Sequence, residues 1–443
     1  MADPAKPIDV PHPDARPGDA PDFSHIQVPP AGKLARPHVL AEAATLRGFP
    51  FDLIRVLDDD GQAVGEWNPG LDADTLRAGL KTMLLTRDYD ARMLKMQRTK
   101  RLSFYMKCLG EEAVATAGAM ALDFEDMLFP SYRQQAAYIS RAKQGGEREA
   151  RKAADRQSGG QPAPSEAPRA ARQQEQTILT DMMCHCIGNA RDNLLGRQLP
   201  VHYANKALNW FSVSGNLGTQ FPQAVGWSMA SALKGETAIA SSWIGDGTTA
   251  EGDFHAALTL ASTYNAPVIL NVVNNQWAIS MHNSISGGKA ETFASKAIGY
   301  GLPGLRVDGN DFLAVYAATR WAAERARNGG GATLIELYTY RGEAHSTSDD
   351  PSKYRPKDEW KAWPLGDPVE RLKTHLIGLG EWSEDQHTAL ETEYKDLVSA
   401  AWKAAVGHGT LEEGPHAPVP TMFEGVYADQ PWHLRRQRQE LGI

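Results

Sequence analysis

Cysteine is scarce in this chain, with three copies among 443 residues. A sparse, odd count excludes a disulfide framework and fits a reducing compartment, which predicts a cytoplasmic protein. Cys184-His185-Cys186 could bind a metal, but a second pair of ligands is missing. Residues 178–187 have the pattern of an apolar helix face, so we expect Cys184 and Cys186 to pack as small hydrophobes.

Long apolar runs and an excess of basic charge are also missing. No run is long enough to span a bilayer. The net charge of −8 gives no basic surface for nucleic acid or for a membrane. The N-terminus has no apolar core, so we expect no signal peptide. Five early aspartates argue against an organellar transit peptide: Asp3, Asp9, Asp14, Asp19 and Asp22.

Hydrophobic content (42%) and charged content (23%) are ordinary for a globular protein. We divide the chain into an irregular arm (1–40), an α/β domain (41–365) and a C-terminal helical region (366–443). Within the domain, residues 141–176 are nearly devoid of aromatic and β-branched side chains. Such composition predicts a flexible insertion within a helical region.

Periodicity gives the coarse secondary structure. Apolar residues three and four apart predict helices over 74–99, 221–233 and 312–327, the last capped by Asp311. A helix of small residues is expected over 110–121. Strands are expected at 51–57, 267–273, 305–308 and 332–340. Alternating strands and helices from about 200 to 345 predict an α/β fold with a mainly parallel sheet flanked by helices.

The stretch with the clearest chemistry joins two of these strands. One strand ends in Gly245-Asp246-Gly247, and after a helix the next ends in Asn274-Asn275. Ligands of open parallel sheets bind at the carboxyl ends of the strands. Asp246 and Asn275 offer oxygens that suit Mg²⁺, and the two glycines let the backbone approach a phosphate. We therefore predict a Mg²⁺–diphosphate site.

Three further features each have a plain structural alternative. Arg133 lies in a loop entering a helix, where it could meet an anion or be a surface arginine. The Gly- and hydroxyl-rich loop 212–220 could bind a monovalent cation or a cofactor ring, or only connect two elements. His345, in a polar loop after a strand, could move protons near neutral pH, although most single histidines do not.

Taken together, these stretches resemble a known family. Gly245-Asp246-Gly247 and Asn274-Asn275, one βα unit apart, resemble the thiamine diphosphate signature. With the stretches at 129–135, 214–220 and 345–350, the chain from about residue 40 onward resembles the alpha subunit of branched-chain 2-oxoacid (2-oxoisovalerate) dehydrogenase, apart from the segment 141–176. The run His345-Ser346-Thr347-Ser348-Asp349-Asp350 favours this branch over pyruvate dehydrogenase. The resemblance implies a thiamine diphosphate-binding fold.

The resemblance also implies roles for individual residues. The ligands of Mg²⁺ would be Asp246, Asn275 and the backbone carbonyl of Trp277. The residues around the diphosphate would be Tyr132, Arg133, Gly245, Gly247 and Thr248. The aminopyrimidine would meet Gly215 and Leu217. A K⁺ site would be formed by Ser214, Thr219 and Gln220. His345 would face the thiazolium, close to the reacting carbon.

Two departures from the family pattern are visible. The metal carboxylate is Asp246, where some relatives have glutamate. Val273 stands where some relatives place an arginine against the diphosphate, so that contact is either missing or supplied elsewhere, with Arg341 as a candidate. Ser346 occupies a position that is phosphorylated in some relatives, where added negative charge would disrupt an anionic site.

The implied reaction is oxidative decarboxylation of a branched-chain 2-oxoacid such as 3-methyl-2-oxobutanoate, with transfer of the acyl group to a lipoyl-bearing acyltransferase. No motif supplies the carboxylate needed on the pyrimidine side. We expect a beta subunit to provide it in an α₂β₂ assembly. The nearest alternative is a pyruvate dehydrogenase alpha subunit. A nucleotide-binding oxidoreductase is less favoured, because Gly245-Asp246-Gly247 lacks the third glycine of that turn, and a non-catalytic scaffold would not need these groups together.

Overall fold

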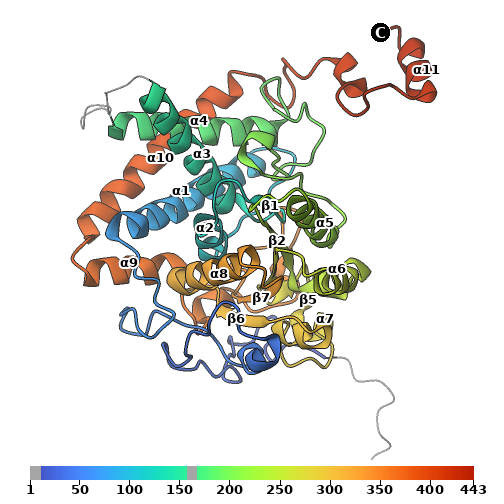
Figure 1. The fold of residues 1–443 in the computed structure, drawn as a ribbon. Coiled ribbons are helices and arrows are strands. Elements are labelled where there is room, and N and C mark those ends of the chain that lie inside the picture. Colours follow the sequence, from blue (N-terminus) through green and yellow to red (C-terminus); the bar gives the residue numbers. More distant parts are fainter. Residues whose placement is uncertain (1–10, 157–166) are drawn as a thin grey trace, which may run out of the picture.

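A five-stranded sheet forms the centre of the molecule (Figure 1). The computed structural model describes residues 11–156 and 167–443. All pairings in this sheet are parallel, and the strand order is β1-β2-β3-β7-β6. The strands are β1 (Met127–Phe129), β2 (Ala240–Gly245), β3 (Val268–Asn274), β6 (Gly304–Asp308) and β7 (Thr333–Tyr338). The predicted α/β class with a parallel sheet is confirmed.

Helices cover both faces of the sheet, and a small hairpin follows β3. The hairpin pairs β4 (Trp277–Ala278) with β5 (Met281–His282). The α-helices are α1 (Ala73–Arg98), α2 (Glu112–Met120), α3 (Gln135–Arg156), α4 (Ala167–Ile187), α5 (Gln220–Leu233), α6 (Gly252–Thr263), α7 (Asn283–Ser286), α8 (Phe312–Arg327), α9 (Pro368–Gly378), α10 (Glu384–Val406) and α11 (Trp432–Glu440). The 3-10 turns used below are η4 (Asp246–Ala250), η5 (Ala294–Tyr300) and η8 (Val419–Phe423).

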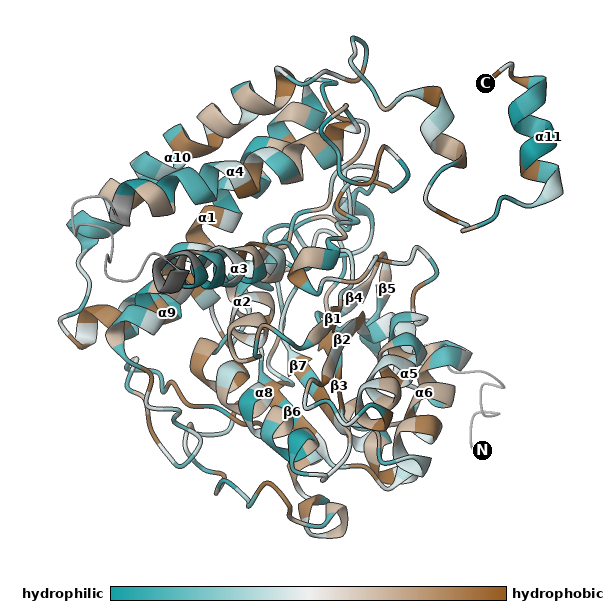
Figure 2. Cartoon of the chain, turned by 45° about the horizontal axis from the view of Figure 1, so that its top comes forward, coloured by the Kyte–Doolittle hydropathy of each residue, from teal (hydrophilic) through white to brown (hydrophobic). Residues whose placement is uncertain are grey.

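The sheet separates two apolar cores. Alternate residues of β3 enter them: Val268, Leu270 and Val272 pack in one core with α5, α6 and η5, whereas Ile269 and Val273 belong to the other, which contains α1, α2 and α8. A parallel sheet covered on both faces needs apolar side chains on both, which explains why every residue of β3 is buried. Figure 2 shows the brown, apolar strands enclosed by helices.

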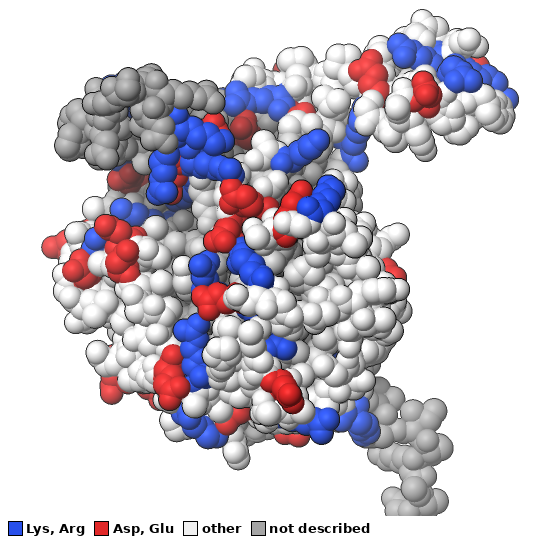
Figure 3. Space-filling model, viewed as in Figure 1, with Lys and Arg blue, Asp and Glu red and all other residues white. Residues whose placement is uncertain are grey.

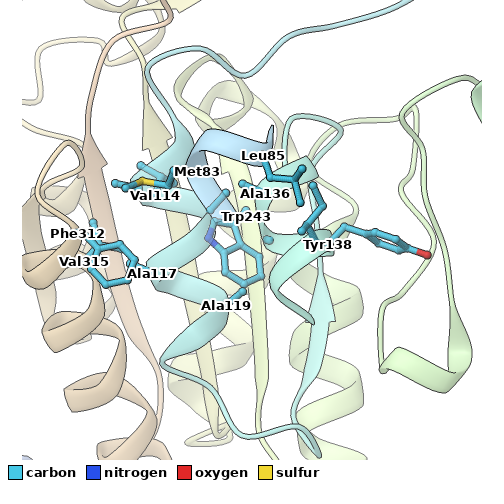
Figure 4. Close-up of a cluster of buried hydrophobic side chains, with 14 of the residues drawn as sticks. Met83, Leu85, Val114, Ala117, Ala119, Ala136, Tyr138, Trp243, Phe312 and Val315 are labelled. Carbon is cyan, nitrogen blue, oxygen red and sulfur yellow. The ribbon is translucent and has the colours of Figure 1, made fainter. Parts of the chain in front are cut away.

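Small residues bring α2 close to its neighbours. The helix reads Glu-Ala-Val-Ala-Thr-Ala-Gly-Ala-Met and packs on α3 and α8. Figure 4 shows the indole of Trp243, from β2, beside Ala117 and Ala119. A Cβ at Gly118 would stand 3.4 Å from Trp243 Cζ2. Close approach therefore explains the predicted run of small residues.

The expected strand over 51–57 is wrong. Residues 51–57 form no strand, only two isolated bridges, Ile54 with Val307 and Leu57 with Ala63. The Asp311 carboxylate accepts the backbone N–H groups of Val56 and Leu57 at 2.8 and 2.6 Å, so these groups do not enter a sheet. Asp311 also caps α8, as predicted, by accepting from Ala314 N at 3.0 Å.

The described residues of the predicted insertion over 141–176 are helical, and the flexibility of this segment stays a prediction. Its described residues belong to α3 and α4, and 157–166 lie outside the described residues, as do 1–10 of the arm. Aromatic residues are rare in this segment, but Ala, Arg, Gln and Glu are strong helix formers.

The C-terminal helices pack on the main body as far as α10. The side chains of Leu376, Leu397 and Ala401 lie in the same core as α1 and α2, and α10 contacts α1 and α4. After α10 the chain still pairs with the body through a bridge between Asn189 and His416. Beyond it, η8 and α11 form a projecting arm (Figure 1). In Figure 3 both basic and acidic side chains are visible on that arm and over the body. The three-part division of the chain stays a prediction.

Candidate active site

The predicted site residues follow four neighbouring strands. β1 leads to Tyr132 and Arg133, β2 to Asp246, β3 to Asn275, and β7 to the loop that carries His345. Because β1, β2, β3 and β7 lie side by side, their carboxyl ends meet at one edge of the sheet, where ligands of such sheets bind. The structure therefore brings residues from four separate stretches to one place.

Asp246 has the character expected of a cation ligand. It begins η4, is 1% exposed, and its Oδ2 has no hydrogen-bond partner. Burial raises the pKa of Asp246 to about 7, against the lowering effect of the Gly247 N–H. A buried carboxylate oxygen without a partner is costly, so the local structure fits a bound cation that would take this oxygen.

Asn275 lies at the end of the adjacent strand and is nearly buried. Its Nδ2 donates to Glu111 Oε1 at 2.8 Å, and its Oδ1 accepts from Trp277 N at 3.3 Å. The carbonyl of Trp277 accepts from Arg341 Nη1 at 2.9 Å. A carboxylate, an amide oxygen and a carbonyl are the hard oxygen ligands that Mg²⁺ takes in proteins.

Val273 and Arg341 occupy different environments. The side chain of Val273 packs in the apolar core below the edge of the sheet. It therefore cannot make the diphosphate contact that an arginine makes at this position in some relatives. Arg341 is 1% exposed, and its guanidinium also donates to the carbonyl of Ile279 and the hydroxyl of Tyr354, each at 2.8 Å. These bonds assign Arg341 to holding the loops around the site, and its contact with a diphosphate stays a prediction.

The two glycines of the motif have different surroundings. A Cβ at Gly247 would stand 2.4 Å from the Cβ of Ala278, whereas a Cβ at Gly245 would meet no atom within 4 Å. Gly247 is therefore needed for the approach of the β4–β5 hairpin. Open space beside Gly245 and the nearly buried Thr248 leave room for a ligand against this turn.

Arg133 is not a surface arginine, so that alternative is wrong. It is 3% exposed, donates to the backbone carbonyl of Lys107 and donates through Nη2 to the carbonyl of His345 at 3.0 Å. Its Nε lies 3.4 Å from Glu111 Oε1. The guanidinium carbon stands 5.4 Å from the centre of the Tyr132 ring. Arg133 thus connects the start of α2 with the His345 loop.

The His345 loop is held by several polar contacts. His345 N donates to Asp349 Oδ2 at 2.7 Å, and the same oxygen accepts from the Tyr354 hydroxyl at 2.6 Å. Thr347 Oγ1 accepts from Tyr105 N at 3.1 Å. These bonds fix the backbone on both sides of Ser346, which is itself 8% exposed.

The imidazole of His345 is half-buried and faces the Tyr132 ring, with 5.7 Å between the ring centres. Burial, together with the nearby cationic Arg133, lowers the pKa of His345 to about 3. The ring is therefore neutral across the physiological range, and it can accept or donate a hydrogen bond according to its tautomer.

The loop 214–220 lies beside η4. A Cβ at Gly218 would stand 3.4 Å from Thr248 Cγ2. The hydroxyls of Ser214 and Thr219 both donate to the Asn216 carbonyl, at 3.2 and 2.9 Å, and Gln220 Oε1 accepts from Gly218 N at 2.9 Å. Gly215 is exposed and Leu217 half-buried, so this loop presents backbone to a ligand or a partner. Its K⁺ site stays a prediction.

The two cysteines of the Cys-His-Cys run are buried and free, as predicted. Cys184 and Cys186 are at most 2% exposed, and His185 Nδ1 lies 3.0 Å from Asp192 Oδ1. Throughout residues 11–156 and 167–443, no three side chains of His, Cys, Asp or Glu form a cluster that could hold a metal. The packing interpretation is confirmed for this run.

Glu111 is the site residue that the sequence did not reveal. It is 2% exposed and contacts both Arg133 and Asn275. The only signal in the sequence that could have pointed to Glu111 is a pair of adjacent glutamates at the start of a helix. One acidic residue is enough to interact favourably with the N-terminal end of the helix dipole, so the second glutamate is free for another role. Asp349 and Tyr354 were also missed as supports of the His345 loop.

Comparison with known proteins gives the family. The model of the dehydrogenase E1 component matches residues 80–158 and 170–412, and that of the 2-oxoisovalerate dehydrogenase E1 alpha subunit N terminal matches residues 7–44. The chain is 55% identical over 436 residues to the 2-oxoisovalerate dehydrogenase subunit alpha of Pseudomonas aeruginosa, covering 98% of each chain.

More distant relatives agree. The chain is 34% identical to the 3-methyl-2-oxobutanoate dehydrogenase subunit alpha of Mycobacterium tuberculosis, covering 89% of this chain and 95% of the relative. It is 33% identical to the human mitochondrial 2-oxoisovalerate dehydrogenase subunit alpha, covering 89% and 80%. The chain belongs to the dehydrogenase E1 component family, in the branch of the 2-oxoisovalerate dehydrogenase alpha subunits.

Proposed function

We propose that this chain is the alpha subunit of a thiamine diphosphate-dependent dehydrogenase of branched-chain 2-oxoacids, with 3-methyl-2-oxobutanoate as a substrate. The observation that carries the proposal is the buried, unpartnered Oδ2 of Asp246 at the sheet edge where Asn275, Arg133 and His345 also lie. Relatives named for this substrate class support it.

Mg²⁺ and the diphosphate would be held by groups from adjacent strand ends. Asp246, Asn275 and the Trp277 carbonyl would bind the metal, which keeps its remaining positions for water and phosphate. Arg133 and Tyr132 would contact the diphosphate, with the backbone of Gly247 and Thr248. Guanidinium matches phosphate geometry, and Arg133 is fixed by two backbone carbonyls.

Thiamine diphosphate, when bound, supplies the carbanion chemistry that removes carbon dioxide from a 2-oxoacid. The protein would place and shield the reacting atoms. His345 stands on a loop fixed by Asp349 and Thr347, and its neutral ring would hydrogen-bond at the reacting end of the site without adding charge. The acyl group would pass to the lipoyl group of a partner acyltransferase.

A beta subunit would complete the site in an α₂β₂ assembly. The backbone at Gly215 and Leu217 would meet the pyrimidine ring from one side, and the partner would supply a carboxylate from the other. Large apolar side chains are exposed beside the site on the β4–β5 hairpin and α7: Ile279, Met281 and Ile285. Exposed apolar groups at one place are typical of a surface that a partner covers.

Reconstitution tests this proposal. The purified chain should decarboxylate 3-methyl-2-oxobutanoate negligibly, and activity should appear when the beta subunit is added. Full activity of the isolated chain would refute the two-subunit site. Parallel turnover of pyruvate decides between the branched-chain and pyruvate dehydrogenases, and faster turnover of pyruvate would overturn the proposed substrate.

The K⁺ site has its own measurement. Ser214, Thr219 and Gln220 would bind K⁺ through oxygen lone pairs that their present hydrogen bonds with Asn216 and Gly218 do not all occupy. Thermal stability of the assembled protein should then rise on replacing Na⁺ by K⁺ at constant ionic strength. The same stability in both salts would exclude this site.

A further inference from the structure

Two adjacent glutamates open α2, and they have different environments. Glu112 accepts from Arg87 Nε at 2.6 Å and from Gly110 N at 2.8 Å, so it pairs a charge and closes the turn. Glu111 is the N-cap residue of α2, yet its side chain makes no capping hydrogen bond. Its carboxylate is directed instead to Asn275 and Arg133.

The two contacts of the Asn275 side chain define its amide orientation. An ionised carboxylate only accepts hydrogen bonds and a backbone N–H only donates. The atom facing Glu111 must therefore be the nitrogen, and the atom near Trp277 N must be the oxygen. A metal such as Mg²⁺ binds the oxygen alone, so the partner of the nitrogen decides whether the oxygen points to the metal.

The backbone that carries Glu111 is fixed to the segment that directly follows β7. Gly110 has φ +94°, and a Cβ there would stand 2.2 Å from the Tyr340 carbonyl oxygen. The Gly110 carbonyl accepts from Thr339 Oγ1, and the Leu109 carbonyl from Gly342 N, both at 2.8 Å. Glu111 is thereby held at the sheet edge by main-chain contacts rather than by its own side chain.

We propose that Glu111 is a positioning residue of the metal site, which orients the Asn275 amide for Mg²⁺ and steadies Arg133 for the diphosphate. This inference rests on the proposed function, because it concerns the same site. Residues that orient metal ligands through hydrogen bonds commonly change metal affinity by 10- to 100-fold when replaced.

Glu111→Ala tests the orientation. Isothermal titration of the alpha–beta assembly with Mg²⁺, at saturating thiamine diphosphate, should show affinity about 10- to 100-fold weaker than wild type. Glu111→Gln should lose less, because its amide oxygen still accepts from Asn275 Nδ2. Glu112→Gln is the matched control: it changes an equally buried neighbour that faces Arg87, and it should lower thermal stability while leaving Mg²⁺ affinity unchanged.

A double-mutant cycle separates orientation from general damage. In an Asn275→Asp background both side-chain oxygens can bind the metal, so no amide needs orienting, and Glu111 adds like-charge repulsion. Glu111→Ala and Glu111→Gln should then leave Mg²⁺ affinity unchanged or tighten it. Equal losses in both backgrounds, or wild-type affinity of Glu111→Ala, would overturn the inference while leaving the proposed function intact. Failure of the wild-type assembly to bind Mg²⁺ with thiamine diphosphate would overturn both.

Discussion

Replacing Asp246 by Asn should stabilise the metal-free protein while removing its response to Mg²⁺. The carboxylate is buried with one oxygen unpartnered, and burial raises the pKa of Asp246 to about 7. A raised carboxyl pKa means that the folded state disfavours the charged form. The penalty is absent below about pH 4, grows as pH rises, and is complete above about pH 7.

The size of the stabilisation follows from the difference between the ordinary aspartate pKa and that of Asp246. At roughly 1.4 kcal/mol per pH unit, the span from an ordinary aspartate to about 7 corresponds to about 4 kcal/mol at pH 8. Unfolding entropy of about 2.1 cal/mol/K per residue makes 1 kcal/mol worth roughly 1 °C in Tm for a chain of this length. Asn can still accept the Gly247 N–H, so Asp246→Asn should raise Tm by about 4 °C at pH 8.

Thermal unfolding followed by circular dichroism checks both halves of the prediction. In EDTA, the gain in Tm at pH 8 should shrink toward zero near pH 4. With Mg²⁺ and thiamine diphosphate at about 100 times their Kd, wild type should gain about 2.7 kcal/mol and the variant almost nothing. An unchanged Tm at pH 8, or an equal Mg²⁺ response in the two proteins, would refute the reasoning.

Three other predictions concern the same edge of the sheet. Gly247→Ala should lower the free energy of unfolding by about 1–3 kcal/mol in denaturant titrations, because its Cβ would meet Ala278 at 2.4 Å. Gly245→Ala should leave the free energy of unfolding unchanged but weaken cofactor binding. Equal destabilisation of the protein by the two substitutions would contradict the geometry. The His345 ring should show no protonation midpoint between pH 5 and 8 by NMR, since burial and Arg133 lower its pKa to about 3; a midpoint above pH 5 would be inconsistent with this. Thr347→Val removes the acceptor of a backbone N–H at 3.1 Å, and the loss of this hydrogen bond should cost about 1 kcal/mol. We expect roughly fivefold lower activity and faster proteolysis of the loop. Unchanged activity would show that this bond does not position His345.

The sequence predicted the parts of the site that lie at strand ends. Asp246 and Asn275 were found because each follows an apolar strand, and the strands are close in sequence. Helix α1 was found because its apolar residues recur every three or four positions. Strand β1 was missed, since three residues carry no periodic signal.

Contacts between distant stretches could not be predicted in this way. Glu111 and Asn275 are 164 positions apart, and nothing local to either indicates their pairing. The segment 51–57 has strand composition, but the Asp311 carboxylate takes the backbone N–H groups of Val56 and Leu57. Whether such a segment forms a strand or a loop depends on which distant residue binds it, and only the folded structure shows that residue.

The order of the strands also has a consequence for unfolding kinetics. Arg133 and His345 meet across 212 positions, so this edge of the sheet forms only after distant segments have paired. Contacts of this kind tend to be absent from a folding nucleus that starts from local structure. Mg²⁺ and thiamine diphosphate should therefore slow unfolding and leave the folding rate almost unchanged.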